Sequence, residues 1–181
     1  MQFEIEVINA NNCPVEKIRE ASRVNETVFE KQCQLPSTSY ANFQPDYWIF
    51  IYEITEDGKL LLGKLDLTLS TSTLQNHTIK KAKISNVGIF PFARHKHVGT
   101  ELLRKATKLC SKNNFDYLYI FCDKKVVPFY KGSGFIQFSK ENPEKPKQPL
   151  LFAKPISKRC QKNPNIILQD FKQSFNKDKQ Q

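Results

Sequence analysis

The chain has 181 residues, 39% of them hydrophobic and 12% aromatic, a composition that suits one globular domain with a sizeable core. It contains no apolar run long enough to span a membrane and no basic segment followed by an apolar one at its start. Its five cysteines show no metal-ligand spacing, and three lie in apolar-periodic segments. We therefore expect free thiols, no metal, and an intracellular location in the cytoplasm or nucleus.

The formal net charge of +10 favours an anionic partner such as nucleic acid, an acidic membrane or a polyphosphate cofactor. The lysines are scattered, however, and ordinary solubility accounts for such a charge as well. No aromatic–basic RNA signature accompanies them. We expect no membrane partner and rank nucleic-acid binding last.

In the first half of the chain, residues 3–8 alternate as a half-buried strand does. A helix is predicted to begin near Val15, after Pro14, and to continue toward Cys33 as one helix or as two broken near Asn25. Then follow a loop over 37–45, strands over 47–54, 60–69 and 79–90, a turn at 56–59, and a polar loop over 70–78.

The second half begins with an amphipathic helix over 98–112 and a strand over 117–122. Asp123 is predicted to cap a short helix that carries Pro128 in its first turn. Strands over 135–138 and 150–156 follow, separated by a loop over 142–149. These elements predict an α/β (α+β) fold with a mixed central sheet of six to seven strands flanked by helices.

The C-terminal segment differs in composition from the rest. We divide the chain into a domain over 1–156 and a basic tail over 157–181, with a short helix around Ile167, Phe171 and Phe175 and a disordered end. The helix either docks on the domain or binds a protein partner.

One stretch, Asn86 to Cys110 (NVGIFPFARHKHVGTELLRKATKLC), reads as a strand, a tight basic loop and a helix. This arrangement directs backbone N–H groups and the positive end of a helix at one place, which suits a phosphate or pyrophosphate. Gly99 permits close approach of the backbone to such a ligand.

Together with YLYIFCDKKVVPFYKGSGF, this stretch resembles the GNAT superfamily of N-acetyltransferases. The resemblance covers residues 3–156 in element order and is specific in two blocks, 87–103 and 123–135. In the first block, Arg94 and Gly99 match the family's Arg/Gln-x-x-Gly-x-Gly/Ala loop. In the second, Asp123 takes an asparagine position, and Tyr130, Gly134 and Phe135 match directly.

The resemblance implies a fold in which acetyl-CoA lies with its pyrophosphate on the loop and its pantetheine arm at a splay between the fourth and fifth strands. It also implies that Tyr130 donates a proton to the departing thiolate, since a phenol of pKa about 10 can protonate a thiolate whose thiol has a pKa of about 8.5. The implied cofactor-binding residues are Val87, Gly88, Ile89, Arg94, His95, Lys96, His97, Val98, Gly99, Thr100, Asp123 and Tyr130.

The sequence departs from the family pattern at two points. His97 stands at the position of the family's first glycine. If this position requires a positive φ, histidine suits it less well than glycine. The imidazole of His97 either has no role or contacts a phosphate of the cofactor. The strand before the loop carries Lys81, Lys83, Ser85 and Asn86 rather than a carboxylate base. Asp66 and Glu53 on the preceding hairpin are therefore the candidate bases, the alternative for each being a solvated strand face. Cys122 is interpreted as a buried thiol rather than a nucleophile.

We expect an N-acetyltransferase that transfers the acetyl group of acetyl-CoA to a primary amine by direct attack. The acceptor is a protein N-terminus, a lysine side chain or a small amine. The alternative is a GNAT-fold subunit without catalysis that serves as a binding or structural protein, with a protein partner held through the C-terminal tail.

Overall fold

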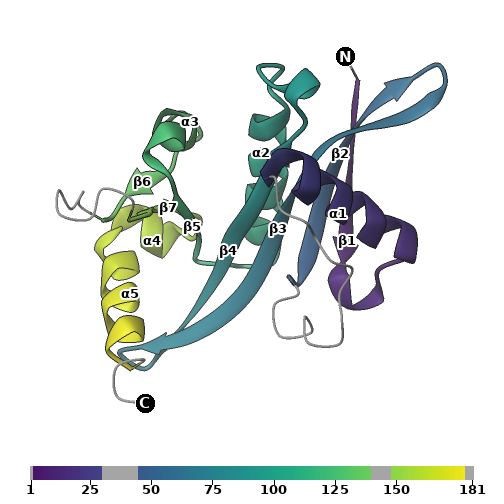
Figure 1. Cartoon of the computed structure of the whole chain (residues 1–181). Helices are drawn as coiled ribbons and strands as arrows, with labels where there is room; N and C mark the ends of the chain where they lie inside the picture. Colours follow the sequence, from purple (N-terminus) through teal and green to yellow (C-terminus); the bar gives the residue numbers. More distant parts are fainter. Residues whose placement is uncertain (1, 30–44, 140–147, 178–181) are drawn as a thin grey trace. The chain divides into compact units, whose positions relative to one another are not determined.

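The fold is built around a mixed β-sheet. The computed structural model describes residues 2–29, 45–139 and 148–177, and within them seven strands follow the order β1-β2-β3-β4-β5-β7-β6 (Figure 1). This confirms the predicted sheet of six to seven strands. Its members are β1 (Phe3–Asn9), β2 (Tyr47–Thr55), β3 (Gly58–Leu74), β4 (His77–Ile89), β5 (Tyr117–Cys122), β6 (Ile136–Gln137) and β7 (Leu150–Pro155).

The helices follow the predicted positions closely. The α-helices are α1 (Val15–Phe29), α2 (Val98–Lys112), α3 (Val127–Gly132), α4 (Lys158–Lys162) and α5 (Asn165–Lys177), and short 3-10 turns are η1 (Ala10–Asn12), η3 (Pro91–Ala93) and η4 (Lys124–Val126). Helix α1 runs through Asn25 without a break. The predictions for Cys33, for the loops at 37–45 and 142–149 and for the disordered end lie wholly or mostly outside the described residues.

The chain divides into two compact units. The first comprises Met1–Thr68 and Ile84–Ala106, and the second Leu69–Lys83 and Thr107–Gln181. Strands β3 and β4 and helix α2 contribute residues to both, and each unit is described by itself below.

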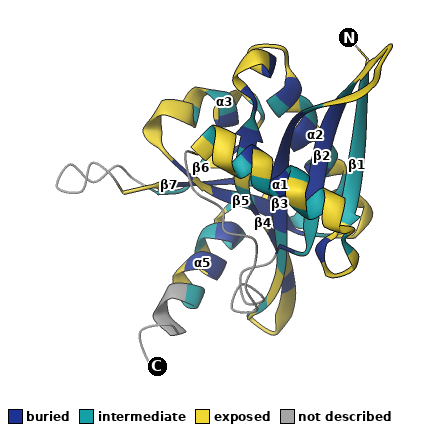
Figure 2. Cartoon of the chain, turned by 45° about the vertical axis from the view of Figure 1, so that its right-hand side comes forward, coloured by how far each residue is buried: buried dark blue, intermediate teal, exposed yellow. Residues whose placement is uncertain are grey.

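In the first unit, strands β1, β2 and β3 pair antiparallel, with Trp48 opposite Asp66. Helix α1 crosses one face of these strands and keeps its outer side exposed (Figure 2). Its Ala21 packs against a row of buried aromatic residues on β2, Trp48, Phe50 and Tyr52. Burial of an apolar side chain of this size contributes about 1.5–3 kcal/mol, so this row anchors the helix.

In the second unit, β5 pairs parallel with β4 at residues 81–83 and antiparallel with β7 along its whole length. Helix α5 packs on this part of the sheet through Ile167 and Phe171, which join one apolar cluster with Tyr117 and Leu151. The short amphipathic helix predicted in the tail therefore exists, and it docks on the protein.

One predicted element is wrong. Residues 70–78 are not a loop: β3 runs on to Leu74, and β4 begins at His77. Gln75 and Asn76 form the two-residue connection, both with positive φ (49° and 62°), as a tight hairpin turn with the right-handed strand twist requires. The prediction failed because the serines and threonines read as polar loop, although threonine favours strands, and because Gln-Asn is not a usual turn signal.

Three cysteines, Cys110, Cys122 and Cys160, are buried free thiols, which confirms that expectation. Among the described helices, none combines the length and apolarity that crossing a bilayer demands.

Candidate functional site

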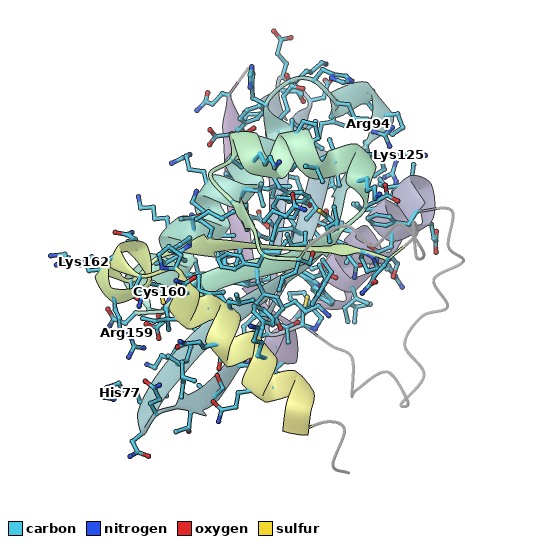
Figure 3. The ribbon with its side chains drawn as sticks, turned by 90° about the vertical axis from the view of Figure 1, so that its left-hand side faces the viewer. His77, Arg94, Lys125, Arg159, Cys160 and Lys162 are labelled. Carbon is cyan, nitrogen blue, oxygen red and sulfur yellow. The ribbon has the colours of Figure 1, made fainter. Side chains whose placement is uncertain are left out.

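The basic loop begins where strand β4 ends. The N–H of buried Phe90 donates to the carbonyl of Leu62 on β3 (3.0 Å), and the turn η3 follows directly. Arg94 closes that turn through its own N–H, which donates to Pro91, and its Nε donates to the carbonyl of Ile89 (3.4 Å). The Arg94 side chain remains exposed (Figure 3). The loop is thus anchored at its root, with a guanidinium on its outer side.

Two residues of the loop, His95 and His97, have φ of 61°. This left-handed conformation is uncommon for residues other than glycine, and tight turns containing it form concavities lined by backbone N–H groups that bind anions. Position 97 therefore has the positive φ that the sequence analysis considered. The positive φ also explains why glycine would be favourable at this position.

Helix α2 begins immediately after the loop, since the carbonyl of His97 accepts the N–H of Glu101 (3.0 Å). Val98 is buried and fixes the first turn, whereas Thr100 is exposed. The N–H groups of residues 98–100 have no carbonyl one turn earlier in the helix, and the helix dipole adds about half a positive charge there. The predicted cofactor-binding residues from Arg94 to Thr100 therefore form one continuous turn and helix start, and their donors and cations fit a pyrophosphate.

Val87, Gly88 and Ile89 form the end of β4, directly after Asn86, whose φ is 47°. A left-handed residue inside a strand bends the strand and redirects the residues that follow. A Cβ on Gly88 would lie 2.7 Å from Val24 of α1, and a Cβ on Gly63 would lie 2.4 Å from the Gly88 carbonyl oxygen. Gly88 therefore has a packing reason to be glycine, in addition to the predicted contact with the cofactor.

Asp66 lies on β3 and is buried, not solvated as its alternative interpretation had it. Its Oδ1 pairs with Nζ of Lys64 at 2.5 Å, and its Oδ2 accepts the side-chain amide of Asn86 at 2.6 Å. Lys64 is completely buried, whereas Asn86 is an exposed residue whose amide reaches inward. Sequence reasoning missed Lys64 and Asn86 as partners, although the i, i+2 spacing of Lys64 and Asp66 places both on one face of a strand.

Glu53 is half-buried on β2, opposite Phe3 and Leu60. Because Trp48 stands opposite Asp66 and side chains alternate along a strand, Glu53 and Asp66 lie on opposite faces of the hairpin. The two candidate carboxylates are not brought together, so they are alternatives.

In the second unit, Asp123 is a cap as predicted, since its Oδ1 accepts the N–H of Lys125 (2.9 Å), but it caps the 3-10 turn η4. Helix α3, which carries Pro128 in its first turn, begins after Val126 and has no side-chain cap among the described residues. Tyr130 follows on α3 and is only 4% exposed, with its ring packed against Phe129 and Phe135 at centroid distances of 5.0 and 5.7 Å. The chain turns back after α3 at Gly134, whose φ is 82°, which places Phe135 beside Tyr130.

Burial raises the pKa of the Tyr130 phenol, and the nearby Cys122 raises it further. The phenol is thus protonated at neutral pH, as a proton donor has to be before it acts, although its raised pKa also makes it a weaker acid. Burial, together with Asp123, raises the pKa of the Cys122 thiol as well. Since the thiolate is the nucleophilic form, this environment disfavours attack by Cys122.

The strand β4, a loop with two left-handed residues and the N-terminus of α2 follow one another directly, an arrangement whose backbone N–H groups suit an anion. The model of the Acetyltransferase (GNAT) family matches residues 15–135, more than half of the chain. The protein belongs to this family, as the resemblance predicted. No curated protein matches the sequence significantly.

Solved structures support the same fold at low sequence identity. A chain of the NatC complex bound to Gag peptide and CoA has a TM-score of 0.63 and 11% identity, over 87% of this chain and 100% of that one. The ribosomal-protein-S18-alanine N-acetyltransferase from Escherichia coli has a TM-score of 0.59 and 14% identity, over 86% and 95%. The GNAT family N-acetyltransferase YhbS from Escherichia coli, in complex with CoA, has a TM-score of 0.60 and 10% identity, over 86% and 82%.

Proposed function

We propose that this protein is an acetyl-CoA-dependent N-acetyltransferase that acts on a primary amine. The observation that carries the proposal is the turn from Arg94 to Thr100, in which two left-handed histidines lead directly into the N-terminus of α2. Acetyl-CoA supplies an activated thioester, whose carbonyl carbon the amine attacks while the C–S bond breaks. The backbone N–H groups of the loop and the Arg94 side chain bind the pyrophosphate, and the backbone of Val87–Ile89 holds the pantetheine arm.

Tyr130 is proposed to give its proton to the thiolate that leaves. This role rests on the sequence resemblance and is consistent with a phenol that stays protonated at neutral pH. The proton lost by the attacking amine goes to water or to one of the two carboxylates. Glu53 remains a candidate for this task, and Asp66 would have to give up one of its two hydrogen-bonding partners to perform it.

The acceptor is a protein N-terminus, a lysine side chain or a small amine. Two of the structural neighbours carry a peptide or a ribosomal protein in their names, which supports peptide N-termini as the first acceptors to test. The alternative, a GNAT-fold subunit without catalysis, is supported by the histidine at position 97.

Calorimetric titration with acetyl-CoA tests the first step, and binding in the micromolar range is the expected result. An absence of heat at high micromolar ligand would refute the proposal. A screen of peptide N-termini, lysine peptides and small amines then tests turnover. With an accepted amine, Tyr130→Phe is expected to lower turnover at least tenfold, about 1.4 kcal/mol in the barrier, whereas unchanged turnover would remove Tyr130 as the acid.

His97→Gly tests the loop itself. Glycine adopts a positive φ without a Cβ penalty, so this variant is expected to bind CoA at least as tightly as the wild type if His97 is idle. If the imidazole contacts a phosphate, the affinity for CoA falls instead.

A further inference from the structure

Lys64, Asp66 and Asn86 form a hydrogen-bonded chain between neighbouring strands of the first unit, and we refer to them as the β3–β4 network. Lys64 and Asp66 are buried, and each oxygen of the carboxylate has its own donor. A buried ion pair of this kind is weak evidence for stability, because apolar residues of similar volume often stabilise a protein as well or better. A gain in stability therefore does not explain why this ion pair lies on a strand face next to a packed helix.

The conformation of Asn86 supplies another reason. With φ at 47°, Asn86 lies in a left-handed conformation within a strand, a state that costs free energy unless its surroundings offset the cost. Asparagine tolerates this conformation better than most residues, and its side-chain amide is held by a charged acceptor that is itself fixed by Lys64. The network thus anchors the one residue of β4 whose backbone departs from the strand.

The residues that follow Asn86 are those whose backbone groups are proposed to bind the cofactor. Val87–Ile89 come next, and then the loop that carries Arg94 and His97. The close approach of Gly63 to the Gly88 carbonyl leaves little space for another path of this backbone. Because Asn86 directly precedes them, a change in its φ would rotate the N–H and C=O groups of Val87–Ile89 away from the positions that fit this space.

We propose that Asp66, held by Lys64, is a positioning residue that fixes the left-handed Asn86 and thereby orients the backbone of Val87–Ile89 for the pantetheine arm of an acyl-CoA. This inference rests on the proposed function. It assigns Asp66 a task other than that of general base, and it brings in two residues, Lys64 and Asn86, that the resemblance to the family does not mark.

The test uses the double variant Lys64→Met/Asp66→Leu, which removes both charges together and leaves no unpaired ion in the core. It is combined with Asn86→Gly, because glycine adopts a positive φ without a side-chain anchor. Each variant is measured by titration with CoA, by amide hydrogen exchange of residues 86–89 in the free protein, and by denaturant unfolding. The control is Lys81→Met/Asp170→Asn, which neutralises the buried ion pair of the second unit.

With Asn86 in place, the double variant is expected to weaken CoA binding about tenfold and to speed exchange at 86–89, since small displacements of a positioned group have large effects. In the Asn86→Gly background, the same double substitution is expected to weaken binding less than about twofold further, since its route of action is gone. The control is expected to change neither CoA affinity nor exchange at 86–89.

Two results would overturn the proposal: unchanged CoA affinity in a folded double variant, or an equal loss of affinity in the Asn86→Gly background. If the wild type fails to bind CoA, the proposed function is refuted. Amide hydrogen exchange at residues 86–89 then still tests whether Asp66 fixes the conformation of Asn86. Faster exchange at 86–89 in the double variant then supports the link from Asp66 to Asn86, and unchanged exchange refutes it.

Discussion

Each of the two units buries a lysine–aspartate ion pair, and the two pairs are built differently. In the first unit, Lys64 and Asp66 are two residues apart on one strand and reach one further partner, Asn86. In the second, Lys81 on β4 pairs with Asp170 on α5 at 2.6 Å, and Asp170 also accepts hydrogen bonds from Ser72 and Tyr117. The first pair lies within β3 and reaches β4 only through Asn86, whereas the second attaches a C-terminal helix to the sheet.

The difference shows that the same chemistry can serve a local and a long-range purpose. Lys64 and Asp66 share a face as soon as β3 forms. This pair therefore acts only on the conformation of neighbouring residues such as Asn86. Lys81 and Asp170 meet only after α5 has packed, since 89 residues separate them in the sequence. We therefore expect perturbation of the second pair to appear in stability, and perturbation of the first pair to appear in local backbone order and cofactor binding.

The largest effect is expected from Asp170→Ala. It leaves Lys81 buried without its charge partner and leaves Tyr117 without an acceptor, which should lower the free energy of unfolding by about 3–5 kcal/mol. Denaturant titration followed by circular dichroism measures this. The control Lys81→Met/Asp170→Asn should lose much less. A loss below about 1 kcal/mol in Asp170→Ala would contradict a helix held by this pair.

Gly63→Ala tests the close packing beside the first pair. The new Cβ would lie 2.4 Å from the Gly88 carbonyl oxygen, so a backbone has to move, and we expect a loss of about 1–3 kcal/mol together with weaker CoA binding. Gly132→Ala is the matched control, because its Cβ would meet open space at the end of α3. It should be neutral or stabilise by up to about 1 kcal/mol. Equal behaviour of the two variants would refute the tight approach of β3 and β4.

Tyr117→Phe removes one hydrogen bond, 2.6 Å long, from Asp170 and keeps the ring in its cluster. A hydrogen bond to a charged group contributes about 1.5–3 kcal/mol, and part of that loss is expected in the free energy of unfolding. Tyr119→Phe, whose ring also contacts Phe171, serves as the control and should lose less. A larger loss in Tyr119→Phe would show that the Tyr117 hydroxyl contributes little.

The smallest effect is expected in the pH dependence of stability. Burial by itself raises the pKa of Asp170, but hydrogen bonds from Lys81, Ser72 and Tyr117 outweigh it and hold the pKa below its usual value. Because the unfolded carboxyl binds its proton at higher pH than the folded one, this stabilisation is present at neutral pH and is lost below about pH 4. Between pH 7 and pH 2, the free energy of unfolding should fall less steeply for Asp170→Asn than for the wild type. Identical slopes would contradict the lowered pKa of Asp170.

Much of the fold could be predicted from local patterns. The helix over 98–112 has the observed bounds because its apolar residues recur at helical spacing and are buried as one stripe. Strand β5 was equally clear, and so was the cap at Asp123, although it starts a 3-10 turn rather than the α-helix that follows. The hairpin at 70–78 was missed, because polar strand residues lose their periodic signal where both faces are partly exposed.

The candidate site could be predicted only in part. The loop from Arg94 to Thr100 can be recognised from its residue types and from the helix that follows. The burial of Asp66 could not be read from the chain, because a Lys-x-Asp strand face is usually solvated and only the packing of neighbouring segments encloses it.

Local sequence therefore decided which segments are strands and helices, which residues share a face, and where a turn suited to an anion lies, since these depend on neighbours within a few residues. The tertiary structure decided which faces are buried, that Asn86 and His97 adopt positive φ, and that Asp66 meets Asn86 while Asp170 meets Lys81. These outcomes depend on contacts between segments distant in sequence, and the free energy of burying a charge or straining a backbone is set by those contacts.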